Sequence, residues 1–98
     1  MKIRINRAKL YRGDLVNYEN TRCCPIGFMY RKFAKKKIKS KSDPKPYEFI
    51  LKKFKVPSLY TIWSTNDSSF LDNKEKEQRI IAFCKQNMGL DVEYYGSY

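Results

Sequence analysis

A dense run of basic residues in the middle of this chain cannot enter a protein core. Between residues 31 and 45, eight side chains are positively charged and only Asp43 is negative. Lysine and arginine are almost never fully buried without a partner, so the run has to stay in contact with water. Its like charges also repel one another until an anion neutralises them. We therefore expect a solvated, lysine-rich loop at about residues 35–46.

The apolar segments on either side of this run are sufficient for one small domain. The chain has 98 residues, of which 42% are hydrophobic, and a domain of this size buries a core without needing disulfides or a metal. Charge is uneven, because residues 1–56 hold 17 basic and 4 acidic side chains while residues 57–98 hold 4 and 6. We predict a single domain over residues 1–98 with a basic N-terminal half.

The residue types that are absent exclude several kinds of chemistry. The chain has no histidine, which excludes a Ser-His-Asp or Cys-His catalytic pair and a histidine-containing zinc site. Cys23, Cys24 and Cys84 form no CxxC pair, and the four glycines form no phosphate-binding loop. A thiol before Pro25, at an expected helix start, is the best enzymatic feature, but no histidine can act as its base. We predict no enzyme, no cofactor and no metal site.

Three features of the sequence indicate the compartment in which the protein acts. The N-terminal residues alternate charged and apolar side chains, which is not the pattern of a signal peptide. The longest apolar run, residues 80–84, is far shorter than the roughly 20 residues that cross a bilayer. Three cysteines without a disulfide framework are typical of a reducing compartment. We therefore expect a cytoplasmic protein.

Secondary structure in the first half follows from periodicity and capping residues. Lys2-Ile3-Arg4-Ile5 alternates with period two and predicts a short strand. Asn6 is suited to cap a short helical turn that ends at Gly13. Pro25 suits the first position of a helix, which Gly27 weakens without ending. The buried stripe of that helix would consist of Ile26, Met29, Tyr30 and Phe33.

The segment 47–56 fits two structures. Its apolar residues lie on one helical stripe, but they also alternate as on the two faces of a strand. We interpret it as a strand, because Pro57 closes it and the β-branched and aromatic segment 59–63 follows as a second strand of a hairpin. The strand places Lys52 on the buried face, which counts against this interpretation.

The last third predicts a helix and a final strand. Asp72 followed by Glu75 resembles a capping box, and Gly89 is suited to end the helix. Residues 90–95 then alternate as a strand. The resulting strand-helix-strand-strand-helix-strand order predicts an α+β fold of the ferredoxin-like type, with a four-stranded antiparallel sheet and two helices.

Basic residues interleaved with aromatic ones are the strongest functional signal. On a strand, Tyr47 and Phe49 would share an exposed face with Lys53 and Lys55, so that bases could stack while lysines meet phosphates. We therefore predict a non-enzymatic module that binds RNA or single-stranded DNA. The residues expected to bind nucleic acid are Arg31, Lys32, Lys35, Lys36, Lys37, Lys39, Lys41, Lys45, Tyr47, Lys52, Lys53 and Lys55.

Two other interpretations of the charge stay open. The richness in lysine, asparagine, isoleucine and tyrosine is also typical of an AT-rich genome. That bias should raise the glutamate content as well, but glutamate is not abundant in this chain. The basic face is equally suited to an acidic protein surface, or to a protein with nucleic acid bound, which predicts a protein-protein inhibitor of a host complex. Charge alone does not separate these partners.

The opening of the chain resembles a group of small bacteriophage and prophage proteins. The residues that carry the resemblance are a short strand, the Gly13-Asp14 turn and Cys24-Pro25-Ile26-Gly27 at a helix start. These proteins have a CPIA-type helix start, with alanine where this chain has Gly27, and the similarity covers about residues 2–33. The resemblance implies a viral protein acting in the host cytoplasm, and for the alternative function it implies a phage-encoded inhibitor of a host nucleoprotein or defence complex.

Overall fold

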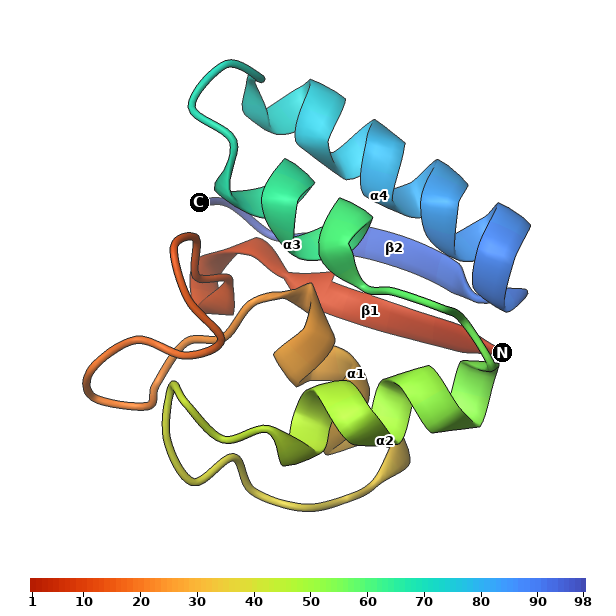
Figure 1. Ribbon diagram of the computed structural model, residues 1–98. Helices are drawn as coiled ribbons and strands as arrows, with labels where there is room; N and C mark the ends of the chain where they lie inside the picture. Colours follow the sequence, from red (N-terminus) through yellow and green to blue (C-terminus); the bar gives the residue numbers. More distant parts are fainter.

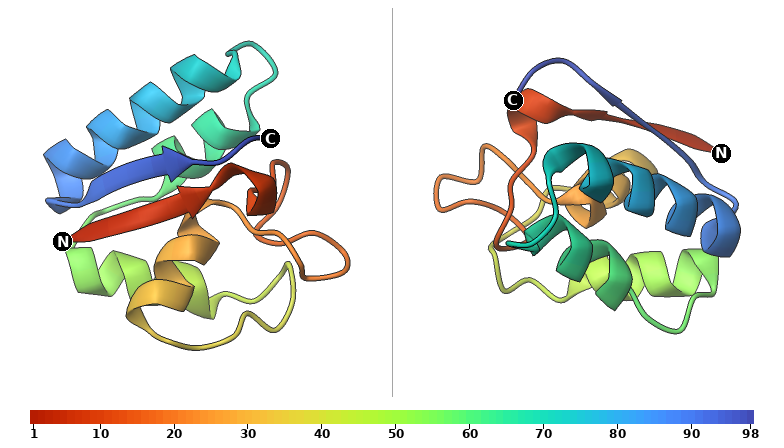
Figure 2. Two further views of the ribbon diagram at one scale, coloured as in Figure 1. Left: turned by 180° about the vertical axis from the view of Figure 1, so that it is seen from behind. Right: turned by 90° about the horizontal axis from the view of Figure 1, so that it is seen from above.

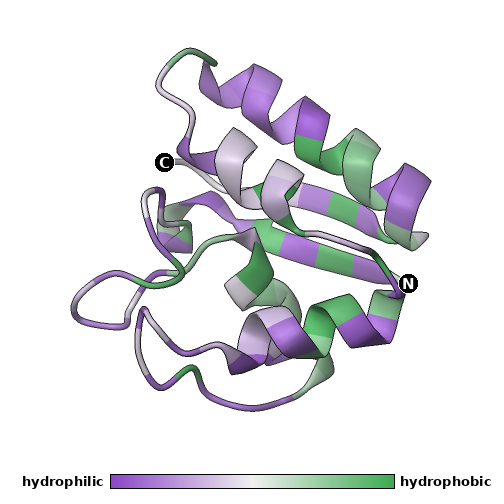
Figure 3. Cartoon of the chain, in the orientation of Figure 1, coloured by the Kyte–Doolittle hydropathy of each residue, from purple (hydrophilic) through white to green (hydrophobic).

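The first and last strands of the chain lie side by side. In the computed structural model, which describes residues 1–98, β1 (Lys2–Asn6) pairs with β2 (Asp91–Tyr95) in a two-stranded parallel sheet. Ile3 lies opposite Val92 and both are buried, whereas Arg4 is exposed on the other face. Each strand therefore alternates hydrophobic and hydrophilic residues (Figure 3). Only one face of the sheet is buried.

Helices supply the connection between the two parallel strands, which a tight turn cannot make. They are α1 (Pro25–Phe33), α2 (Lys45–Phe54), α3 (Tyr60–Asp67) and α4 (Asn73–Met88), with the short 3-10 helix η1 (Arg7–Lys9) directly after β1. All four helices cover the same face of the sheet, as the right view of Figure 2 shows. In the view of Figure 1, α4 lies beyond the edge of the sheet formed by β2, and α1 and α2 lie beyond the edge formed by β1. None of the four is long and apolar enough to cross a lipid bilayer.

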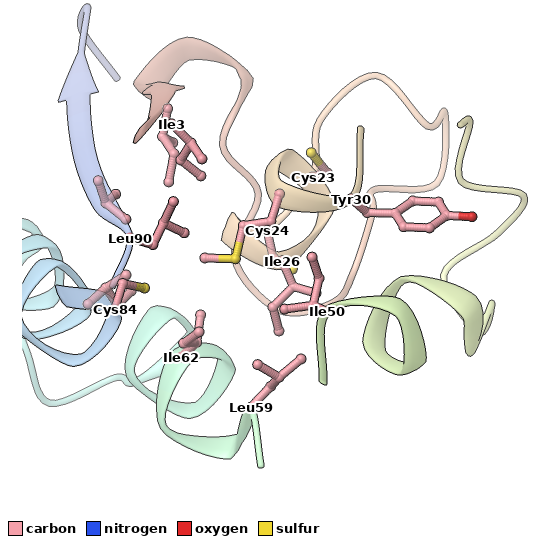
Figure 4. Packing of buried hydrophobic residues seen from close by; sticks show 14 of the residues in the cluster. Ile3, Cys23, Cys24, Ile26, Tyr30, Ile50, Leu59, Ile62, Cys84 and Leu90 are labelled. Atoms are coloured by element: carbon pink, nitrogen blue, oxygen red, sulfur yellow. The ribbon is translucent and has the colours of Figure 1, made fainter. Parts of the chain in front are cut away.

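A single hydrophobic core fills the space between the sheet and the helices. Both strands and all four α-helices contribute fully buried or nearly fully buried side chains, and burial of apolar area is the main stabilising contribution. Figure 4 shows side chains of this core meeting from all sides, among them Ile3, Ile26, Ile50, Ile62, Cys84 and Leu90.

Several elements are those that the sequence predicts. The N-terminal strand, the helix that begins at Pro25 and the closing strand are all present. The Asp72 carboxylate accepts a hydrogen bond of 2.8 Å from the backbone N–H of Glu75, as expected at the start of α4. Gly89 ends that helix in the left-handed conformation, at φ 60°. Local capping signals therefore predict these boundaries correctly.

The expected strand at residues 47–56 is wrong, because this segment forms α2. Ile50 is fully buried on the helix, with Tyr47, Leu51 and Phe54 half-buried beside it. This is the helical stripe that the sequence also allows. The helix leaves Lys52 exposed, whereas a strand would have buried its ammonium group at a high energetic cost.

The ferredoxin-like fold expected from the sequence is therefore also wrong. The segment 59–63, expected to be the partner strand of a hairpin, begins α3 instead. With both central strands replaced by helices, the sheet has two parallel strands rather than four antiparallel ones. The structure is a small α+β domain with four α-helices.

Candidate nucleic-acid interface

The basic run forms an extended connection between α1 and α2, residues 35–44, which we call the lysine loop (yellow in Figure 1). Its single apolar residue, Ile38, is 2% exposed and belongs to the core. Ile38 packs against Gly27 of α1, where a Cβ would lie 3.1 Å from Ile38 Cδ1. The loop is therefore packed on α1, with lysines on both sides of one buried anchor.

Hydrogen bonds hold the backbone of the lysine loop from its middle to the start of α2. The Asp43 carboxylate accepts from the backbone N–H groups of Lys39 and Lys45, at 3.2 and 3.1 Å. These two N–H groups lower the pKa of Asp43. The Asn20 side-chain amide donates to the Ile38 carbonyl at 2.8 Å. The one carboxylate of the run thus shapes the backbone and forms no ion pair with a lysine side chain.

Residues 31–55 contain eleven basic side chains, and none of them forms an ion pair. We call these eleven, all of them exposed, the basic surface. The five ion pairs of the molecule involve only β1, η1, α4 and β2, and they are Lys2–Glu93, Arg4–Glu93, Arg7–Glu77, Arg79–Glu75 and Lys85–Asp91. Carboxylates neutralise the other side of the protein and leave the basic surface to solvent.

Three of these lysines converge on a shallow groove of about 280 Å³ between the end of α1 and the outer face of α2. Lys36 comes from the loop, and Lys45 and Lys52 lie two turns apart on α2. The lysine groove is lined by Tyr30, Ala34, Lys36, Lys45, Glu48, Phe49 and Lys52. The Tyr30 and Phe49 rings meet edge to face, with centroids 5.8 Å apart, and form an aromatic wall.

The other predicted binding residues do not line this groove. Lys53 extends the surface along α2, with its Nζ atom 5.4 Å from the centre of the Phe33 ring. Lys39 and Lys41 line a separate hollow of about 250 Å³ with the loop around Tyr18. Arg31, Lys32, Lys35, Lys37 and Lys55 are exposed and line neither hollow.

Tyr47 lies apart from the lysines. The helix turns it toward a different cavity, which it lines with Cys24 and Trp63, and no lysine reaches that cavity. The shared exposed face of Tyr47, Lys53 and Lys55 expected on a strand does not exist. Phe49 keeps its place beside the lysines. The sequence assigns Tyr30 to the core, and its contribution to the groove has no separate sequence signal.

The three cysteines are free and buried, at 2% exposure or less. Burial raises the pKa of Cys23 to about 11 and those of Cys24 and Cys84 to about 12. At the start of α1, backbone N–H groups act on Cys24 in the opposite direction, but burial has the larger effect. The thiols are therefore protonated at neutral pH, which does not favour a reactive thiolate.

Elsewhere, no group of three or more cysteine and carboxylate side chains is placed to hold a metal ion. Comparisons of this chain with protein-family models, curated proteins and solved structures find no match.

Proposed function

We propose that this protein is a non-enzymatic module that binds RNA or single-stranded DNA along the basic surface. The observation that carries the proposal is the set of eleven exposed cations without an ion-pair partner, three of which line a groove with an aromatic wall. Lys36, Lys45 and Lys52 contact phosphates, and the exposed part of Phe49 stacks against a base.

The kind of cation supports backbone contacts rather than sequence readout. Ten of the eleven basic residues are lysines, which act on phosphate as point charges. The one arginine, Arg31, donates a hydrogen bond of 3.0 Å to the Asn20 side chain. Bidentate contacts from arginine to guanine are the commonest specific contacts in the major groove, and this surface offers little of that chemistry. Binding is therefore expected to depend on salt and to tolerate many sequences.

The proposal is tested by the salt dependence of binding to a labelled single-stranded oligonucleotide. Each phosphate contact on a single strand contributes about 0.7 to the slope of log affinity against log salt. Replacing Lys36, Lys45 and Lys52 together with glutamine should therefore reduce the slope by about two units. An unchanged slope would contradict the proposal.

A matched control removes three positive charges from elsewhere, as Lys9→Gln, Lys74→Gln and Lys85→Gln together. These lysines are exposed and lie outside the basic surface. The control variant should keep the slope of the original protein if local contacts decide binding, and a loss equal to that of the groove variant would show that only net charge matters. Competition with duplex of the same length tests the preference for single strands.

A second candidate function is inhibition of a host nucleoprotein or defence complex through a protein contact. Large apolar side chains exposed on α3 and the loop after it favour this alternative: Tyr60 is 60% exposed and Phe70 95%. Capture of partners from host lysate with and without nuclease separates the two. Partners that disappear with nuclease support nucleic-acid binding, and a stoichiometric protein that survives supports inhibition. In both cases we propose that the protein acts in the cytoplasm, in the host cytoplasm if it is viral.

A further inference from the structure

A second cavity has the opposite chemical character to the lysine groove. It encloses about 350 Å³ where the turn after η1, the start of α1, α2 and α3 come together. We call it the acidic cavity, and it is lined by Gly13, Asp14, Cys24, Tyr47, Trp63 and Asp67. Two carboxylates and two aromatic rings line it, and no basic residue does, although the chain has a net charge of +11.

Each carboxylate of the acidic cavity has one oxygen that accepts no hydrogen bond from the protein. Asp67 Oδ1 accepts from the Gly13 backbone N–H at 2.8 Å and from the Asn66 side-chain amide at 3.3 Å. Asp14 Oδ1 accepts from the Leu15 backbone N–H at 3.2 Å. Oδ2 of each aspartate has no protein donor, and neither carboxylate forms an ion pair. The protein therefore positions both groups without neutralising either.

The local electrostatic field is negative despite the overall charge. Burial raises the pKa of Tyr47 to about 12, and the charges that act on it in the same direction include Asp14 and Asp67, with no basic group opposing them. Lys76 lies near Asp67 but does not line the cavity. Asp14 and Asp67 are the only charged side chains that line it.

The aromatic walls suit the same ligand as the carboxylates. The Trp63 ring lies edge to face with that of Tyr60, at 4.8 Å between centroids, and 40% of Trp63 is exposed. Indole is the best of the protein rings for attracting a cation, and Tyr47 offers a second ring. A volume of 350 Å³ is in the usual range of small-ligand sites.

We propose that the acidic cavity binds an organic cation, a substituted ammonium or guanidinium group. Trp63 and Tyr47 surround the apolar part of that group, and Asp14 and Asp67 balance its charge. The group comes either from a free small molecule or from the lysine or arginine side chain of a basic peptide. The carboxylates that attract the cation repel phosphates, so the cavity is not part of the proposed nucleic-acid surface.

Trp63 provides a direct measurement, since it is the only tryptophan in the chain. Its fluorescence is followed while choline, arginine amide or 3,3-dimethylbutanol is added, the last being the uncharged isostere of choline. The two cations should produce a saturable change with a dissociation constant of about 1 mM or tighter, and the isostere should bind at least about tenfold more weakly. Tighter binding of choline indicates a free ligand, and tighter binding of arginine amide indicates a peptide side chain.

Variants test the role of the carboxylates. Asp14→Asn keeps an oxygen to accept from Leu15 and removes the charge, and it should weaken cation binding by about tenfold. Glu48→Gln is the matched control, because it removes one negative charge from the lysine groove and should leave cation binding unchanged. If Asp14→Asn fails to fold, the comparison of choline with its isostere in the original protein still tests whether the cavity selects for positive charge.

Two results would overturn the proposal: no saturable change with either cation, or equal binding of the isostere. A saturating oligonucleotide should leave choline binding unchanged. The proposals for the basic surface and for the acidic cavity are therefore tested separately.

Discussion

Tyr47 and Phe49 are two residues apart and have different surroundings. Phe49 lies in the lysine groove, and Tyr47 lines the acidic cavity on another side of α2. A helix separates positions i and i+2 by about 200°, whereas a strand puts them on the same face. The choice between helix and strand therefore decides which ring accompanies the lysines.

Alanine substitutions at these two positions should have different effects on binding. Phe49→Ala should weaken oligonucleotide binding by about 1 to 3 kcal/mol, the usual contribution of one stacked base. Tyr47→Ala should lower the free energy of unfolding but leave the affinity of the folded protein unchanged. Fluorescence anisotropy well below both melting temperatures measures the affinities. Equal losses for the two variants would contradict the assignment of Phe49.

Gly27 shows the limit of prediction from a single residue. The sequence correctly places it in a helix, where glycine costs about 1 kcal/mol relative to alanine. Glycine occupies this position despite the cost because a Cβ at Gly27 would lie 2.6 Å from the Cβ of Cys23. No local pattern indicates this contact or that with Ile38, so the packing of the lysine loop on α1 could not be predicted.

Among the elements, those with local start and stop signals were predictable and α2 was not. Helix α4 has Asp72 and Gly89 at its ends, and the chemistry of these caps is independent of the rest of the fold. The N-cap residue of α2, Pro44, has no side chain that can accept a hydrogen bond, and the C-cap Lys55 adopts the left-handed conformation at φ 55°, which is uncommon for a lysine. The conformation of α2 depends instead on packing its apolar stripe against α1 and the core. The apolar stripe fits a strand as well, so the sequence signal that separated the two was Lys52, which a strand would place on its buried face.

The lysine loop should depend on its single anchor. Ile38→Ala removes a buried side chain and should lower the free energy of unfolding by about 2 to 5 kcal/mol. It should also weaken oligonucleotide binding, because a released loop has to be ordered again in the complex. Denaturant unfolding and anisotropy measure the two effects. Lys37→Ala, at the exposed neighbour, should change stability by less than about 0.5 kcal/mol. Unchanged stability of Ile38→Ala would show that the loop is not packed on α1.

For the whole molecule, the sequence predicts the uneven charge and the α+β class but not the sheet. Sequence reasoning correctly separates a basic half from the remainder, and ion pairs occur only outside the basic surface. The parallel pairing of β1 with β2 depends on contacts between residues about 90 positions apart, such as Ile3 with Val92. Periodicity identifies each strand and carries no information about its partner.

One ion pair joins the two ends of the chain to α4 and makes stability depend on pH. Arg7 donates two hydrogen bonds of 2.8 Å to the Glu77 carboxylate, which also accepts from the Tyr98 hydroxyl. The hydrogen bonds from Arg7, followed by that from Tyr98, lower the pKa of Glu77 in the folded state. Stability from this group is therefore present above about pH 4.3, the unfolded pKa, and is lost as the pH falls through the lower folded pKa.

Glu77→Gln should accordingly lower the free energy of unfolding at pH 7 by about 1 kcal/mol, a value reduced for partial solvent access. The difference from the original protein should shrink as the pH falls toward 3. Urea unfolding across this range measures it. Glu75→Gln, which loses an exposed ion pair on the same helix, should show a small difference at every pH. A constant deficit for Glu77→Gln would mean that its charge does not contribute.

The pairing of β1 with β2 also determines when the protein is able to fold during translation. The strand made first has to wait for residues 91–95, which are made after all four helices. A ribosome carrying an incomplete chain therefore holds helices whose apolar faces have no sheet to cover them, next to ribosomal RNA and with the lysine-rich half already synthesised. Folding is completed only when the last strand leaves the exit tunnel, and such distant pairing slows it.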